Sequence, residues 1–140
     1  MVNRLRILIH DWLQVLDVRG SCDNSQIVSC SMDKTVMLWD VTSGNWTRKW
    51  RGHQAAVNCV AFNEDSSVVV SGSVDTTVKV WDTRSRAQDP IQTLEEPRDS
   101  VTSLDISDHE VGPEYRAVIG CCSLAILRRD WLLQSRNTEL

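Results

Sequence analysis

Two thirteen-residue stretches of this 140-residue chain are near copies of each other. Val28–Asp40 reads VSCSMDKTVMLWD and Val70–Asp82 reads VSGSVDTTVKVWD, with eight of the 13 positions identical. The Trp-Asp pairs that end the two stretches lie 42 residues apart, a spacing typical of an array of similar structural units. Because one such unit cannot bury its apolar faces alone, the duplication predicts neighbouring units packed side by side.

Short strands are predicted in both units, because apolar and polar residues alternate between clusters of turn-forming residues. The cluster NEDSS, for example, separates two apolar runs of the second unit. A third unit opens with DSVTSLDISDHE, in which the apolar spacing recurs. The expected strands are Gln14–Val18, Gln26–Ser31, Thr35–Asp40 and Asn45–Trp50 in the first unit, and Val57–Phe62, Val68–Ser73, Thr77–Asp82 and Ile91–Glu95 in the second.

The second unit, GHQAAVNCVAFNEDSSVVVSGSVDTTVKVWD, resembles a WD repeat over its full length. It begins with Gly-His, contains an Asp turn and ends with Trp-Asp. The resemblance implies an all-β WD-repeat propeller fragment of about two four-stranded antiparallel blades plus part of a third. The expected parts are an atypical N-terminal segment (1–13), blade 1 (14–51), blade 2 (52–96), the first strand of a third blade (97–110) and a segment that does not match the repeat (111–140).

The last thirty residues depart from the repeat, since no second half of a WD unit follows Glu110. Leu124, Leu127 and Trp131 fall at helical spacing there, and Ser123 is a suitable residue for a helix N-cap. The pattern predicts a short C-terminal amphipathic helix from about Leu124 to Ser135. Because both ends differ from the repeat, we expect a truncated or variant form of a longer propeller.

By the same resemblance, each unit carries a Ser, an Asp and a Trp of a buried hydrogen-bonded tetrad whose fourth member is a His. A buried Asp beside a His is costly unless every polar atom finds a partner, and a ring of hydrogen bonds supplies those partners. The tetrad is therefore expected to be structural. Its residues are His53, Ser71, Asp75 and Trp81 in the second unit and Ser29, Asp33 and Trp39 in the first, whose His position falls near Asp11, one place after His10.

Ser, His and Asp are also the residue types of a nucleophilic triad, which is the rival interpretation. The recurrence of the Ser-Asp-Trp set and the lack of a GxSxG motif around Ser71 disfavour it. The sequence also contains no Walker A loop, GxGxxG, HExxH or CxxC motif. We therefore predict that the chain is not an enzyme and holds no cofactor and no metal.

Charge and cysteine content narrow the class of partner and the compartment. The net charge is −4, which disfavours nucleic-acid binding, because phosphate contacts need a basic surface. The five cysteines are odd in number, and no apolar stretch is long enough for a secretory signal or a membrane span. We expect reduced thiols in a cytosolic or nuclear protein. We also expect that the protein does not associate with a membrane and has no small-molecule substrate.

The segment Trp81–Glu110 extends the resemblance beyond the generic repeat, to WD-repeat scaffolds that assemble kinases of the Raf–MEK–ERK cascade. This implies a non-enzymatic protein–protein interaction scaffold in the cytoplasm and nucleus. Scaffolds of this group are also linked to a prolyl hydroxylase of hypoxia signalling and to spliceosome subunits in pre-mRNA splicing. The expected partners are therefore kinase-cascade components, such a hydroxylase or spliceosomal proteins.

Partners of a propeller are expected on its rims and loops, where side chains are free of the demands of the core. The alternative function is that of a substrate receptor of a cullin-four ubiquitin ligase. A basic residue two positions after Trp-Asp, as in Trp-Asp-Thr-Arg, resembles the motif with which such receptors face their adaptor. A further alternative is an inactive propeller fragment. The candidate partner-binding residues are Arg48, Arg51, Asp82, Arg84 and Arg86.

Overall fold

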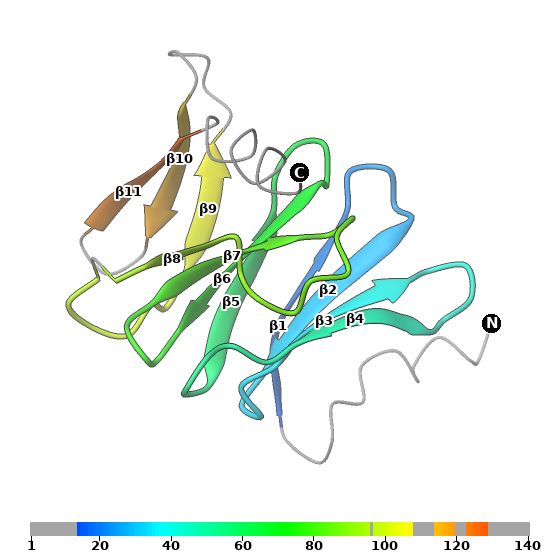
Figure 1. Ribbon diagram of the computed structural model, residues 1–140, viewed down its shortest axis with the longest axis horizontal. Coiled ribbons are helices and arrows are strands. Elements are labelled where there is room, and N and C mark those ends of the chain that lie inside the picture. The colour runs from blue at the N-terminus through cyan, green and yellow to red at the C-terminus, as the bar shows by residue number, and fades with distance from the viewer. Residues whose placement is uncertain (1–13, 96, 108–113, 120–122, 129–140) are drawn as a thin grey trace.

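The computed structural model describes residues 14–95, 97–107, 114–119 and 123–128, which form three antiparallel sheets (Figure 1). In each sheet the strands pair in chain order, so every connection is a simple hairpin. The first sheet contains β1 (Val15–Gly20), β2 (Gln26–Ser31), β3 (Val36–Asp40) and β4 (Trp46–Trp50). The second contains β5 (Val57–Phe62), β6 (Val68–Ser73), β7 (Val78–Asp82) and β8 (Gln92–Leu94), and the third β9 (Leu104–Ser107), β10 (Glu114–Ile119) and β11 (Ser123–Arg128).

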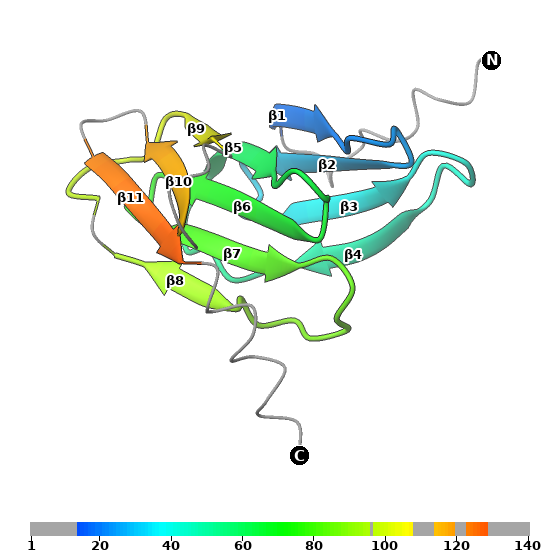
Figure 2. The ribbon, with the colours of Figure 1, turned by 90° about the horizontal axis from the view of Figure 1, so that it is seen from above.

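The three sheets stand side by side in chain order, as blades do (Figure 1). The first strand of the second and third sheets lies against the preceding sheet: β5 lies against β1 and β2, and β9 lies against β5 and β6. Seen from above, β4 and β8 lie on the opposite side of the array from β1 and β9 (Figure 2). The all-β prediction of two four-stranded antiparallel blades plus part of a third is confirmed.

The second sheet is buried on both faces, which explains its almost continuous apolar strand β6. All six residues of β6 are buried, although strands with one wet face alternate between apolar and polar residues. Val69 packs with Trp81 into the core shared with the first sheet, whereas Val68 and Val70 pack toward Val101 and the third sheet. One face of this sheet therefore forms a core with the first sheet, and the other face forms a core with the third sheet.

The two four-stranded sheets repeat each other in backbone detail. Asn24 and Ser66 adopt left-handed φ angles of 59° and 58° in the first turn of each sheet. Lys34 and Thr76 do the same in the second turn, at 70° and 67°. A left-handed φ is unusual for a β-branched residue such as Thr76 and persists only where neighbouring contacts enforce it. Turn geometry therefore repeats at positions where the residue type differs.

The expected helix from about Leu124 to Ser135 is wrong for residues 124–128, which belong to strand β11. The rest of that range lies outside the described residues. β11 pairs with β10 from Glu114↔Arg128 to Ile119↔Ser123, and β10 pairs in turn with β9. Periodicity does not separate a short apolar run in a strand from one in a helix. Here the open edge of β9 offers hydrogen-bond partners to β10, and β10 offers them to β11, which favours the extended conformation.

Gly72 on β6 marks the closest approach of the second sheet to the chain that enters the third. A Cβ at this position would lie 2.4 Å from Cγ1 of Val101 and 2.8 Å from Sγ of Cys59. We expect Gly72→Ala to lower the free energy of unfolding by ~1–3 kcal/mol, as overpacked cores do. Urea unfolding measures this change. Gly20→Ala is the matched control, because no atom lies within 4 Å of its added Cβ, and equal losses in both variants would contradict the packing argument.

Candidate functional site

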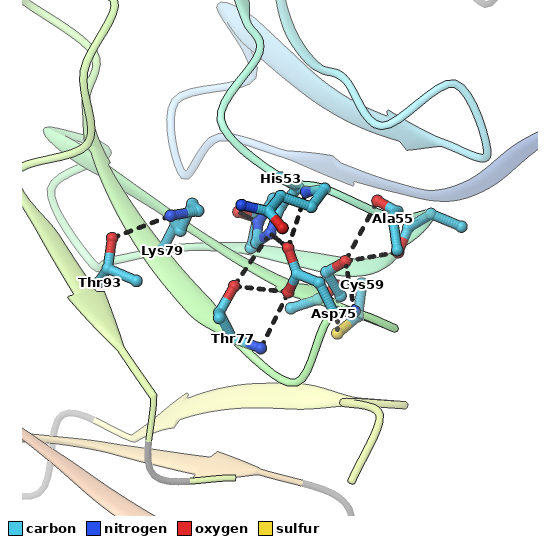
Figure 3. Close-up of polar contacts among 12 residues, drawn as sticks. His53, Ala55, Cys59, Asp75, Thr77, Lys79 and Thr93 are labelled. Atoms are coloured by element: carbon cyan, nitrogen blue, oxygen red, sulfur yellow. Dashed lines mark hydrogen bonds and ion pairs between the residues drawn. The ribbon is translucent and has the colours of Figure 1, made fainter. Parts of the chain in front are cut away.

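A hydrogen-bond network joins four side chains in and next to the second sheet. Two of them, His53 and Asp75, are labelled in Figure 3 together with Thr77. His53 precedes β5, and its Nε2 lies 2.7 Å from Oγ of Ser71 on β6. Its Nδ1 lies 3.0 Å from Oδ2 of Asp75, in the turn between β6 and β7. Trp81 on β7 donates its indole N–H to the same Oγ of Ser71 at 2.8 Å. The structure thus brings together the His, Ser, Asp and Trp that the sequence singled out in the second unit.

The donors and acceptors of this network are consistent with one tautomer of His53. A carboxylate only accepts hydrogen bonds, so the Nδ1 atom that faces Asp75 carries a proton. Burial, together with the charge of Lys79, lowers the pKa of His53 more than the hydrogen bond and charge of Asp75 raise it, so the ring is neutral at pH 7. In a neutral ring Nε2 is an acceptor, and the hydroxyl of Ser71 donates to it while accepting from Trp81.

Asp75 is held as a carboxylate by several donors. Burial alone would raise its pKa, but donors from Thr77, the backbone of Gln54 and His53 outweigh that effect and lower the pKa to about 2. The backbone N–H and the hydroxyl of Thr77 both donate to Oδ1, at 2.9 and 2.6 Å. The backbone N–H of Gln54 donates to Oδ2 at 2.9 Å. The charged side chain therefore ties the turn after β6 to the segment that enters β5.

The network also fastens the second sheet to the first. The ring of Trp50, the last residue of β4, stacks on Trp81 with centroids 5.5 Å apart and planes 18° from parallel. Gly52 lies against the six-membered ring of the Trp81 indole, where a Cβ on Gly52 would come within 2.7 Å of Cη2. Glycine before His53 therefore allows the backbone to approach the ring closely.

The first sheet repeats part of this arrangement. Trp39 donates its indole N–H to Oγ of Ser29 at 2.9 Å. Asp33 accepts from the backbone N–H and the hydroxyl of Thr35 at 2.9 and 2.6 Å, the same distances as for Asp75 and its threonine. The predicted His position, near Asp11 and His10, lies outside the described residues.

The Ser71–His53–Asp75 distances resemble those of a nucleophilic triad, but the surroundings differ. Ser71 is 0 % exposed and His53 is 6 % exposed, so a substrate has no access to the hydroxyl. Its oxygen also accepts the indole N–H, a contact that opposes its use as a nucleophile. The geometry favours a role in holding strands together.

Among the described residues, no group of three or more His, Cys, Asp or Glu side chains is arranged to hold a metal ion. Cys22, Cys30 and Cys59 are not joined in disulfide bonds. The described residues also contain no helix with the length and apolar character needed to cross a membrane.

Sequence reasoning missed two members of the network. Thr77 contacts both Asp75 and His53, and its recurrence as Thr35 two residues after the Asp in each unit was the available signal. For Trp50, the sequence pattern indicates only a place in the last strand of the first unit. Its stacking on Trp81 depends on how two sheets meet, which no local pattern records.

A second candidate site is a groove of about 390 Å³ on the outer side of the first two sheets, hereafter the basic groove. Its wall on the first sheet comes from β4 and the residue that follows it, and its other wall comes from the connection between β7 and β8. The basic groove is lined by Trp46, Thr47, Arg48, Lys49, Arg51, Arg86 and Gln88.

The predicted partner-binding residues divide between this groove and a neighbouring turn. Arg48, Arg51 and Arg86 line the basic groove. Arg48 bridges the sheets, because its Nε donates to the backbone carbonyl of Ser85 at 3.0 Å. Asp82 and Arg84 do not line it: Oδ1 of Asp82 accepts the backbone N–H of Arg84 at 2.8 Å and so shapes the turn after β7.

Comparisons with known proteins agree with this geometry. The sequence matches the family described as WD domain, G-beta repeat, at residues 3–40 and 44–82. The solved structure of U3-55K superposes with a TM-score of 0.71 and 22 % identity, over 85 % of this chain and 37 % of that chain. At this identity the likeness shows the fold alone.

Curated relatives match over shorter segments. Nuclear distribution protein PAC1 of Candida glabrata is 31 % identical over 55 residues, which are 39 % of this chain and 11 % of that protein. The Lissencephaly-1 homolog of Monosiga brevicollis is 43 % identical over 39 residues, which are 28 % of this chain and 10 % of that protein. The match therefore spans about a tenth of the length of these relatives.

Removal of the hydroxyl at the centre of the network tests its structural role. Ser71→Ala leaves the buried N–H of Trp81 and the Nε2 of His53 without their observed partner. Each buried polar group that loses its partner costs about 1–3 kcal/mol, so for these two groups we expect a loss of about 2–6 kcal/mol in urea unfolding. Ser103→Ala, at an exposed serine, is the control. A loss of stability in Ser71→Ala no larger than that in Ser103→Ala would refute the structural role of the network.

The lowered pKa of His53 predicts how stability changes with pH. Below about pH 6.5 the unfolded chain takes up a proton on this ring that the folded chain does not, so stability falls as the pH falls. One such proton is worth a slope of up to about 1.4 kcal/mol per pH unit. Urea unfolding between pH 8 and pH 5 should show a flatter dependence in His53→Gln than in the unmodified chain. Parallel curves would contradict the assignment.

Proposed function

Because this chain belongs to the WD-repeat family, we propose that it is a non-enzymatic scaffold that binds other proteins. WD repeats are in general protein-interaction scaffolds. The observation that carries the proposal is the basic groove, which is formed by side chains of two neighbouring blades and lies outside their shared cores. Arg51 and Arg86 are exposed there and are available to a partner.

The two candidate sites differ in exposure and in role, and this difference supports a scaffold function. His53, Ser71 and Trp81 are buried, and with Asp75 they fix the turn between β6 and β7. The basic groove lies instead on the outer strand β4 and on the connection after β7. Side chains on rims and connections change without cost to the core, so they are where a repeat fold acquires its partners.

For the particular assembly, we propose kinases of the Raf–MEK–ERK cascade, in the manner of the mitogen-activated protein kinase organizer. The support is sequence resemblance in the segment Trp81–Glu110, which lies outside the generic repeat. This segment includes the connection between β7 and β8, with exposed Arg86 and Gln88 in the wall of the basic groove. The residues that carry the resemblance are thus partly residues that a partner can reach.

The same resemblance supports two further classes of partner and a location. We propose that a prolyl hydroxylase of hypoxia signalling and spliceosome subunits are further partners of the same scaffold. A protein with partners in both signalling and splicing works in the cytoplasm and in the nucleus, and we propose both locations.

One observation favours a second function, that of a substrate receptor of a cullin-four ubiquitin ligase. Asp82 accepts the backbone N–H groups of Arg84 and Ser85 at 2.8 and 3.3 Å, which fixes the turn after β7. The side chain of Arg84 is exposed at that turn. An exposed Arg two positions after Trp-Asp, on a backbone held by Asp82, is the feature that an adaptor of such a ligase would contact.

Affinity purification of the tagged full chain, followed by mass spectrometry, tests both functions. We expect kinase-cascade components to be enriched over a tag-only control, and equally so with Arg84→Ala, because Arg84 lies outside the basic groove. Recovery of a cullin-four adaptor that is lost in Arg84→Ala would favour the receptor instead. Recovery of no protein above the control would contradict the scaffold function and favour an inactive fragment.

A further inference from the structure

The charge of the basic groove is opposite to that of the chain as a whole. The chain has 19 acidic and 15 basic residues and a net charge of −4. The groove nevertheless gathers three arginines and a lysine, and none of its lining residues is acidic. Cations crowded together in this way repel one another, and a bound anion relieves that repulsion. The concentration of positive charge therefore points to an anionic ligand.

The groove also exposes a large aromatic side chain. Trp46 is 56 % exposed, whereas Trp39, Trp50 and Trp81 are buried in the sheets. An exposed Trp beside arginines offers an apolar face for an aliphatic or aromatic side chain of a partner, and Trp and Arg are the residues that most often anchor protein interfaces. A ligand that fits this groove therefore carries apolar surface in addition to negative charge.

The arginines approach the groove from both blades and differ in how they are held. Arg48 is fixed by two backbone carbonyls, since its Nε donates to Ser85 and its Nη1 to Thr47, at 3.0 and 2.9 Å. A guanidinium has five N–H donors, so a fixed Arg48 still has donors for a ligand. Arg51 and Arg86 are exposed on opposite walls. A carboxylate placed between the walls would meet Arg side chains from both blades.

We propose that the basic groove binds an acidic, extended segment of a partner protein, with carboxylates on Arg51 and Arg86 and an apolar side chain on Trp46. This inference rests on the proposed scaffold function and names the chemistry of the partner. A volume of about 390 Å³ suits a few side chains of a peptide. A nucleic acid fits less well, because the net charge of −4 and the exposed Asp89, next to Gln88, oppose a long phosphate backbone.

Fluorescence anisotropy with the full chain tests the assignment. The probe is a short fluorescein-labelled peptide of Asp and Glu residues with one central Leu. We expect a dissociation constant on the order of micromolar at low salt, which weakens as salt screens the charges. Arg86→Glu should weaken binding about tenfold or more, and Trp46→Ala should weaken it several-fold. Arg98→Glu is the matched control: it makes the same charge change at an exposed arginine outside the groove and should leave affinity unchanged.

Three results would overturn the proposal. These are equal binding of a peptide with Lys in place of the acidic residues, equal effects of Arg86→Glu and Arg98→Glu, and tighter binding of a single-stranded RNA of the same charge. Circular dichroism of each variant shows that its fold is intact. The scaffold function is judged separately: if Arg86→Glu still captures the same proteins from cells, the groove assignment fails and the scaffold stands, whereas capture of none by the unmodified chain removes the scaffold itself.

Discussion

A charged carboxylate beside a buried imidazole is the constraint around which the second sheet is organised. Asp75 remains ionised because Thr77, Gln54 and His53 donate to it, and His53 remains neutral because it is buried. Thr77 lies in the same turn as Asp75, whereas His53 and Gln54 lie in the segment that enters β5, so the same bonds that compensate for burial of the charge also fix that turn to that segment. A network of this kind is stabilising when every member is satisfied, and no buried side-chain N or O atom among the described residues lacks a partner.

Much of the fold was predictable because its signals are local. In the first and second sheets, the bounds of β2, β5 and β6 are those expected from alternation and turn residues. Most of the other strands in these two sheets differ from the expected bounds by a residue at one or both ends. The left-handed backbone at Thr76 was not predictable, because a β-branched residue seldom adopts it and its neighbours enforce it here. Strand β11 was not predictable either, because its conformation depends on the edge of a neighbouring sheet. The same reasoning holds for Trp50, whose partner Trp81 lies in another blade.

In the candidate sites, too, some residues are marked by a sequence motif, and others are brought together only by the fold. The Ser, Asp and Trp of the buried network recur in the sequence at one spacing, so they could be recognised in advance, and the structure brings them together with His53 in the second sheet. The residues of the basic groove share no motif. Arg48 and Arg86 lie far apart in the chain, and they come together because β4 of one sheet packs beside the β7–β8 connection of the next. The repeated Ser, Asp and Trp help to hold each blade together, whereas the groove residues, which share no motif, give this chain its individual surface.

The stacked indoles of Trp50 and Trp81 have a mechanical consequence. Trp81 is anchored within its own sheet by its bond to Ser71, and Trp50 is the last residue of the outer strand of the neighbouring sheet. Rotating one blade against the other would slide one flat ring across another and pull on that anchored N–H. The stacking therefore restrains rotation of the two blades relative to each other, and with it the separation of the arginines on adjacent blades, which the charges of a partner in the proposed groove would have to match.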